Sequence, residues 1–133
     1  MSYDNPTTVT YSWAAHDFGA GGATNEVRGP SGKRGRVKDV LLTDVTETFT
    51  ADTTSGYVQV GTAADADAYA SLDALVTAAA ATASAGAVTT ATATNFLGDT
   101  TISADTLVQV KFVAPTGGTP AGIASVQVVI DWF

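Results

Sequence analysis

The chain has 133 residues and a formal net charge of −7, and it contains no cysteine. The length suits one domain, and the lack of cysteine excludes disulfides, thiolate zinc sites, iron–sulfur clusters and cysteine nucleophiles. No apolar run reaches the roughly 18–20 residues that a membrane-spanning helix needs, and residues 1–6 have neither the basic nor the apolar part of a signal peptide. We therefore expect a soluble, unexported protein with no membrane partner.

The first predicted element is a strand at residues 8–13. There Val9, Tyr11 and Trp13 alternate with Thr and Ser, a period of two that is typical of a half-buried strand. Thr and Val are abundant along the whole chain, and both pack well on a pleated surface, which favours a mostly β domain. Residues 14–35 follow with six glycines and no usable periodicity.

The pattern of a strand returns at residues 36–50, which predict one long strand or two strands with a bulge between them. The cluster of turn-forming residues at 52–56 ends this region. A short strand is then expected at residues 57–61, with the sequence Tyr-Val-Gln-Val-Gly.

The spacing of apolar residues changes after residue 64. Tyr69, Leu72, Leu75 and Val76 have a helical spacing, and alanine, the strongest helix former, fills the gaps between them. Asp65 or the preceding Thr62 would cap the start of such a helix. We therefore predict one inserted helix over about residues 65–82.

The remaining chain is predicted to be β. Residues 87–94 have little apolar bulk and indicate an edge strand or an ordered loop, whereas residues 105–113 and 123–133 alternate clearly. The fold class expected is an antiparallel β-sandwich or jelly-roll-like domain with one inserted helix. Its expected division is an N-terminal strand with a Gly-rich basic arm at residues 1–34, and a sandwich core at residues 35–133.

The sharpest chemical feature is a basic segment. Five of the six basic residues lie within residues 28–38, where there is no acid: Arg28, Lys33, Arg34, Arg36 and Lys38. The segment is either a solvated loop that offsets an acidic body or a flexible contact arm for an acidic surface of a partner, since Arg pairs bidentately with carboxylates. Nucleic acid is a less favoured partner, because the rest of the chain is acidic and the segment has no aromatic residue for base stacking.

Catalytic and metal chemistry find little support in the sequence. His16 is the only histidine, and it lies beside Asp17. A Ser–His–acid arrangement can assemble in space, but the chain has no Gly-x-Ser-x-Gly elbow. One histidine without cysteine does not make a transition-metal site, so we expect no enzyme, no metal and no cofactor.

Several segments together carry a resemblance to a known class of protein. These are Lys-Arg-Gly-Arg-Val-Lys-Asp-Val at 33–40, Gly-Tyr-Val-Gln-Val-Gly-Thr at 56–62, Asp-Ala-Tyr-Ala at 67–70, and a closing hairpin of residues 104–113 and 117–132. Over about residues 35–133 the chain resembles small virion structural proteins of tailed bacteriophages, in particular capsid decoration (cement) proteins.

This resemblance implies a non-enzymatic protein that binds the outside of an assembled capsid and stabilises it. The implied partner is the major capsid protein, often with a homo-oligomeric binder, and the implied location is the capsid exterior, after assembly in the host cytoplasm. The alternative is a carbohydrate-binding or adhesive β-sandwich of a tail or surface structure, with an aromatic stacking platform made of Tyr11, Trp13, Tyr57 and Trp132. A hydrolase built on His16 is the third hypothesis.

Overall fold

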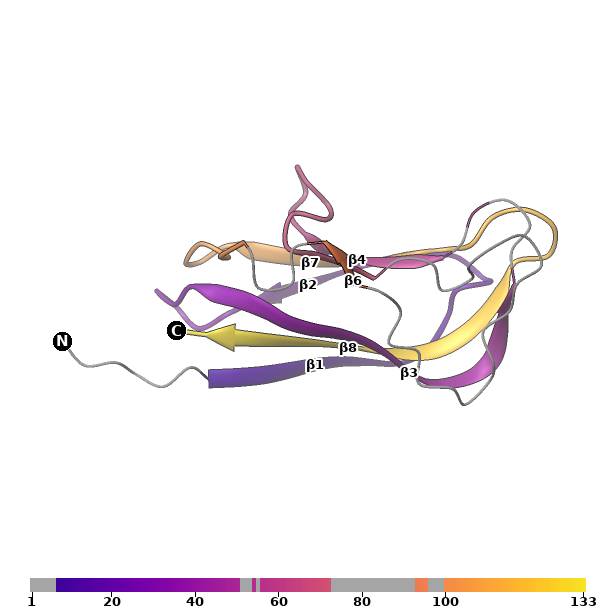
Figure 1. Cartoon of the computed structure of the whole chain (residues 1–133), viewed down its shortest axis with the longest axis horizontal. Coiled ribbons are helices and arrows are strands. Elements are labelled where there is room, and N and C mark those ends of the chain that lie inside the picture. Colours follow the sequence, from indigo (N-terminus) through magenta and orange to yellow (C-terminus); the bar gives the residue numbers. More distant parts are fainter. Residues whose placement is uncertain (1–6, 51–53, 55, 73–92, 96–99) are drawn as a thin grey trace.

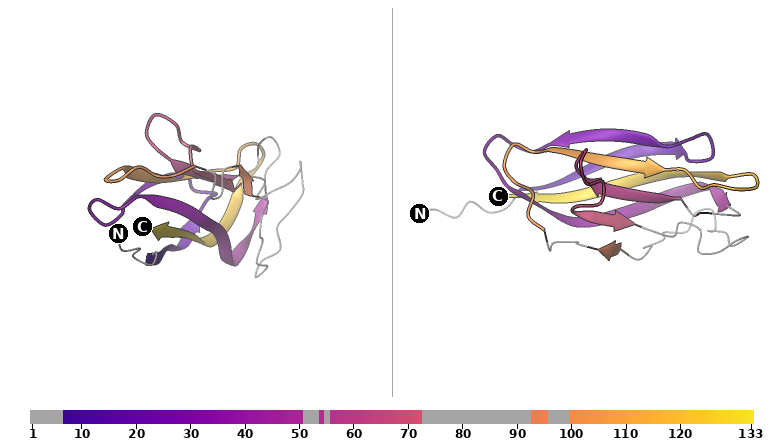
Figure 2. Two further views of the ribbon diagram at one scale, coloured as in Figure 1. Left: turned by 60° about the vertical axis from the view of Figure 1, so that its left-hand side comes forward. Right: turned by 90° about the horizontal axis from the view of Figure 1, so that it is seen from above.

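The computed structural model describes residues 7–50, 54, 56–72, 93–95 and 100–133. Most of these residues lie in two antiparallel sheets (Figures 1 and 2). The three-stranded sheet has the order β1 (Thr7–Asp17), β8 (Ala121–Trp132), β3 (Gly35–Thr50). The five-stranded sheet has the order β2 (Ala23–Arg28), β7 (Leu107–Val113), β4 (Tyr57–Gly61), β5 (Ala70–Leu72), β6 (Ala93–Asn95).

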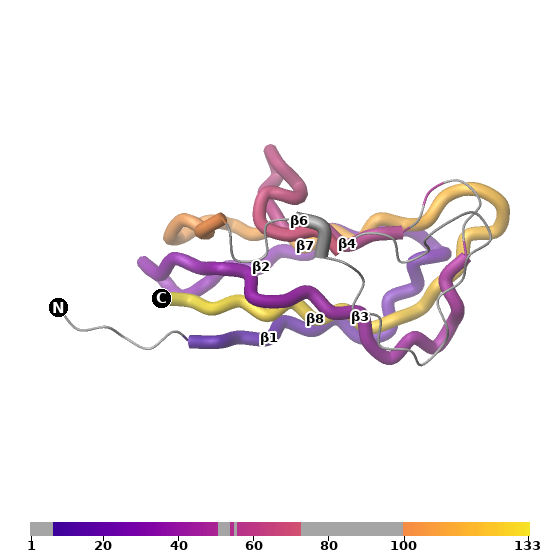
Figure 3. The backbone as a smooth tube through the Cα atoms, viewed as in Figure 1, coloured from indigo at the N-terminus to yellow at the C-terminus, as the bar shows by residue number. Residues whose placement is uncertain are grey.

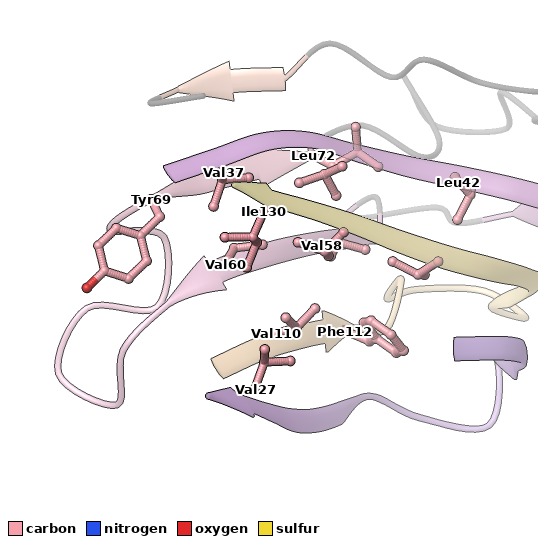
Figure 4. Packing of buried hydrophobic residues seen from close by; sticks show 14 of the residues in the cluster. Val27, Val37, Leu42, Val58, Val60, Tyr69, Leu72, Val110, Phe112 and Ile130 are labelled. Atoms are coloured by element: carbon pink, nitrogen blue, oxygen red, sulfur yellow. The ribbon is translucent and has the colours of Figure 1, made fainter. Parts of the chain in front are cut away.

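The hydrophobic core lies between the inner faces of the two sheets (Figure 4). Strand β8 shows how the sequence produces this arrangement, because each even-numbered residue from Gly122 to Trp132 is buried and each odd-numbered residue is partly exposed. Strand β7 alternates in the same way, with Val108, Val110 and Phe112 buried. The β-sandwich-like fold predicted from the period of two is thus confirmed.

Strand β3 is a single long strand with irregular pairing, one of the two arrangements expected for residues 36–50. Its register with β8 shifts at three places, and Asp44 in the middle interval has a φ of 48°. Bulges of this kind bend a strand and increase its twist. The bent β3 curves around one end of the sandwich (Figure 3).

The predicted helix is not formed where its residues are described. Residues 65–69 form a turn, and residues 70–72 are strand β5; residues 73–82 lie outside the described part of the chain. The hydroxyl oxygen of Thr62 accepts the backbone N–H of Asp65, as a helix cap would, yet the chain turns back at Tyr69, whose N–H donates to Val60. The pairing of β5 with β4 buries Leu72 beside Val58, and this tertiary pairing overrides the helix propensity of the local alanines.

Two further features differ from the sequence-based expectations. Strand β2 lies inside residues 14–35, where no periodicity was evident, and it pairs with β7. Strands β7 and β8 belong to different sheets, so the closing hairpin expected from residues 104–132 is wrong. Strands β1 and β2, both from the N-terminal segment, contribute one strand to each sheet alongside strands of residues 35–133.

Candidate partner-binding surface

The five predicted basic residues lie at one end of the sandwich. Arg28 is the last residue of β2, and Arg36 and Lys38 lie near the start of β3. The loop between these strands crosses from one sheet to the other and lies beside the C-terminal end of β8 (Figures 1 and 2). We call these five residues and their loop the basic end: Arg28, Lys33, Arg34, Arg36 and Lys38.

The loop of the basic end has a defined conformation. The N–H of Lys33 donates to the carbonyl of Pro30 at 3.1 Å and closes a tight turn, in which Gly32 has a φ of +74°. Such a turn favours glycine at this position because an L side chain is strained there. The loop therefore contains a hydrogen-bonded turn between β2 and β3.

Asp105, in the segment before β7, holds this turn in place. Its carboxylate accepts a hydrogen bond from the N–H of Gly32 at 2.9 Å, and its backbone carbonyl accepts one from Nη1 of Arg28 at 2.7 Å. The sequence analysis missed Asp105, because it lies more than seventy residues from both partners. The pairing of β2 with β7 and the bridge between Gly35 and Ile102 bring these segments together.

The side chains of Arg34 and Arg36 are exposed and lie against the same aromatic ring. Their guanidinium carbons are 5.1 Å and 5.5 Å from the centroid of Phe133, within the range of a cation–π interaction. Two backbone hydrogen bonds of 2.9 Å join Arg34 to Phe133 and extend the β3–β8 ladder. Within the described part of the chain, no carboxylate forms an ion pair with either guanidinium, so both remain able to bind an acid from another molecule.

A buried tryptophan packs against the loop of the basic end. The indole of Trp132 is 2% exposed, and its Nε1–H donates to the hydroxyl of Tyr11 at 2.9 Å. The indole lies directly against the backbones of Gly29 and Gly35, where an added Cβ would come within 2.5 Å of its ring. Any side chain at either position would therefore displace the ring or the loop.

Two described acidic residues at this end form hydrogen bonds within the chain. Asp131 lies opposite Arg36 in the β3–β8 register, and its carboxylate accepts the hydroxyl of Thr8 at 2.6 Å. Asp105 is occupied by the loop, as described above. Five of the six basic residues of the chain thus gather at this end, on a protein whose net charge is −7.

His16 lies on β1 away from the basic end, packed among aromatic rings. Its ring centroid is 4.7 Å from Phe18 and 4.9 Å from Phe112, and its Nε2 is 3.0 Å from the carbonyl oxygen of Gly21. The carboxylate of the neighbouring Asp17 accepts the N–H of Ala20 instead. Within the described residues, the imidazole has no hydrogen bond to a hydroxyl or a carboxylate, and the triad considered above is not assembled there.

The four aromatic residues of the expected stacking platform do not share one surface. Trp132 is buried, and Tyr11 and Trp13 pack against the core, with the ring of Trp13 edge-on to Phe112 at 5.8 Å. Tyr57 is half-buried on β4 of the other sheet. A further tyrosine, Tyr69, lies near Asp65. Burial is the main cause that raises the pKa of Tyr69, and the negative charge of Asp65 raises it further.

In the described ranges, no group of three or more His, Asp or Glu side chains gathers as a metal site. The same ranges contain no helix that is long and apolar enough to span a bilayer.

No protein-family model, curated protein or solved structure matches the chain.

Proposed function

We propose that the protein is a non-enzymatic virion structural protein that binds the outer surface of a capsid and stabilises it. Its partner is the major capsid protein, and its location is the capsid exterior. The observation that carries the proposal is the basic end, where Arg34 and Arg36 lie against the ring of Phe133 and form no ion pair with a carboxylate of the described residues. Fixing the side chains in advance lowers the entropy lost on binding, and guanidinium groups bind carboxylates through two parallel hydrogen bonds.

The strand order supports the proposal at the level of the fold. An eight-stranded jelly roll can be described as one long antiparallel hairpin, with strand pairs 1–8, 2–7, 3–6 and 4–5, wrapped into two sheets. Three of these pairs occur here, namely β1–β8, β2–β7 and β4–β5, whereas β6 pairs with β5. We include jelly-roll-like wrapping in the proposal, because viral capsid domains commonly have it.

Repetition makes a small contact surface useful on a capsid. A capsid presents the same site many times, and a binder with several contacts gains affinity through effective concentration rather than through new interactions. The basic end gathers five of the six basic residues of a chain whose net charge is −7, so it can attract an acidic site on the capsid. Binding through it should weaken as salt screens the exposed charges.

The test is binding of the purified protein to expanded capsids that lack it. Each charge-assisted hydrogen bond lost costs about 1.5–3 kcal/mol, so we expect Arg34→Glu with Arg36→Glu to weaken binding by roughly tenfold or more. The single variant Arg34→Glu is compared with Lys111→Glu, which makes the same charge change at an exposed position of β7. Equal occupancy of wild type and double variant would remove the basic end from the proposal.

A carbohydrate-binding or adhesive module is the second candidate. Jelly rolls also occur in lectin domains, which is the observation in its favour. The burial of Trp132 and the packing of the partly buried Tyr11 and Trp13 against the core count against it, because a sugar needs exposed ring faces. A glycan array on which the protein binds a defined sugar, combined with no binding to capsids, would favour this function over the first.

A further inference from the structure

Strand β1 forms one edge of the three-stranded sheet. It pairs with β8 along one side, and within the described residues no strand pairs with its other side. It runs along the lower margin of the molecule in Figure 1. A strand at such an edge presents unpaired N–H and C=O groups that can pair with another chain.

Most of β1 lacks the features that usually block an edge. Its register with β8 is unbroken from Thr7 to Trp13, and residues 7–14 include no charge, no proline and no glycine. Only beyond Trp13 does a bulge interrupt the strand, where Ala15 has a φ of 48°. Seven regular residues span roughly 23 Å, which is long enough for a substantial ladder.

The other sheet edges of the described chain are all protected. Strand β3 shifts register at three places and bears several charges, and the segment at Ile102 bridges its first residue, Gly35. Strand β2 has six residues and includes Glu26 and Arg28. Strand β6 has only three residues. Natural sheets use such devices against edge pairing, so the unprotected β1 stands apart.

We propose that β1 pairs antiparallel with β1 of a second copy of this chain. A two-fold axis perpendicular to the sheet, centred on Thr10, produces a six-stranded sheet with the order β3-β8-β1-β1-β8-β3. Thr10 is the midpoint of the regular stretch from Thr7 to Trp13. The axis places Val9 opposite Tyr11 of the second copy, and Thr8 opposite Ser12.

In this register, core-facing side chains of one copy lie opposite core-facing side chains of the other, and exposed ones lie opposite exposed ones. Val9 and Tyr11 both pack toward the core, while Thr8, Thr10 and Ser12 are exposed. A shift by one residue would place core-facing side chains opposite solvent-facing ones. A second copy is the favoured occupant because the regular stretch of residues 7–13 is uncharged, so self-pairing brings no like charges together. Thr–Thr and Thr–Ser pairs across strands are also favourable.

The proposed dimer is independent of the capsid-binding function. Because β1 begins at the basic end, where Thr7 pairs with Trp132, antiparallel pairing places the two basic ends at opposite ends of the joined sheet. Self-association can therefore be measured with the purified protein alone. The Arg34→Glu/Arg36→Glu variant should dimerise like the wild type, whatever its effect on capsid binding.

The chain has no cysteine, which allows a register-specific test by single-cysteine variants. Residues directly opposite each other in an antiparallel pair have Cα atoms about 4.5–5.5 Å apart, within disulfide range. We expect Thr10→Cys to form a covalent dimer on mild oxidation. Thr8→Cys should not cross-link to itself, but a mixture of Thr8→Cys and Ser12→Cys should give a mixed disulfide dimer.

Two controls separate the proposed interface from chance oxidation and from misfolding. Thr24→Cys, exposed on the edge strand β2 of the other sheet, should remain uncross-linked. In sedimentation experiments, Thr10→Lys should raise the dimer dissociation constant by about tenfold or more, since like charges directly opposite are unfavourable. Mixing it with Thr10→Glu should restore pairing. A wild type that is monomeric at every concentration, or cross-linking of Thr8→Cys and Thr24→Cys as fast as Thr10→Cys, would overturn the proposal.

Discussion

At the scale of single residues, the contact of Trp132 with Gly29 and Gly35 determines how the basic end is held. A methyl group at Gly35 would lie 2.5 Å from the indole and 3.3 Å from Ile102. Overpacking of this kind costs about 1–3 kcal/mol. We expect Gly35→Ala to lower the free energy of unfolding by that amount, measured by urea denaturation.

A double-mutant cycle identifies the indole as the cause. Trp132→Phe removes the fused six-membered ring, so Gly35→Ala should cost much less in that background. Gly32→Ala serves as the matched control, because Gly32 has a positive φ but no atom near its added Cβ. Its cost should be the same with Trp132 and with Phe at that position. Additive losses for Gly35→Ala and Trp132→Phe would show that the ring contact is not responsible.

Residue patterns in the sequence predicted which side chains face the core. Val108, Val110 and Phe112 alternate with polar residues, and the structure buries all three. The sequence could not predict the partners of the basic end, because Asp105 and Phe133 lie far from it along the chain. The one available signal was the pair of glycines flanking the loop, which leave space for a large ring that the sequence does not identify.

At the scale of elements, β8 is the central strand of its sheet, with β1 on one side and β3 on the other. Its two faces differ sharply, since Val128 is fully buried and the adjacent Val129 is partly exposed. Val→Thr keeps the shape of the side chain and adds a hydroxyl. We expect Val128→Thr to reduce the free energy of unfolding by about 1–3 kcal/mol through the buried hydroxyl.

Val129→Thr is the neighbouring control for this prediction. Its hydroxyl would lie on the outer face of the sheet, where substitutions usually change stability by less than about 0.5 kcal/mol. Both variants are measured by the same urea titration, with the slope compared to detect changes in the denatured state. Equal losses at the two positions would contradict the assignment of faces along β8.

The elements also show where local sequence is insufficient. The alanine-rich region after residue 64 has a helical spacing, yet residues 70–72 form β5 because β4 offers a ladder and an apolar surface. Strand β2 was missed because its local pattern is weak: one face is polar, and Val27 is its one buried residue. In both segments the deciding contacts come from strands distant in sequence.

At the scale of the whole molecule, the described chain starts and finishes at the same end of the sandwich, where Thr7 pairs with Trp132. The β1–β8 ladder therefore closes a loop of over a hundred residues. Proteins dominated by such distant pairings fold in about milliseconds to seconds. Joining residue 133 to residue 1 by a short linker and opening the chain between Gly117 and Gly118 would make β8 and β1 neighbours in sequence.

We expect this circular permutant to refold faster than the wild type, by up to about tenfold, because the loop closed by the ladder becomes much shorter. Its unfolding rate should change little if the native contacts are kept. Stopped-flow fluorescence of the tryptophans at several urea concentrations measures both rates. An unchanged refolding rate in a stably folded permutant would show that the β1–β8 pairing forms after the rate-limiting step.

The central position of β8 has a consequence for the nascent chain. Translation delivers β1 first and β8 about a hundred residues later, an interval of roughly 5–20 s at ordinary elongation rates. Throughout this interval residues 7–14 of β1 have neither their partner strand nor a charge to keep them apart from the same segment emerging on neighbouring ribosomes of the same message. Productive folding in the cell thus depends on those segments remaining unpaired until β8 has been synthesised.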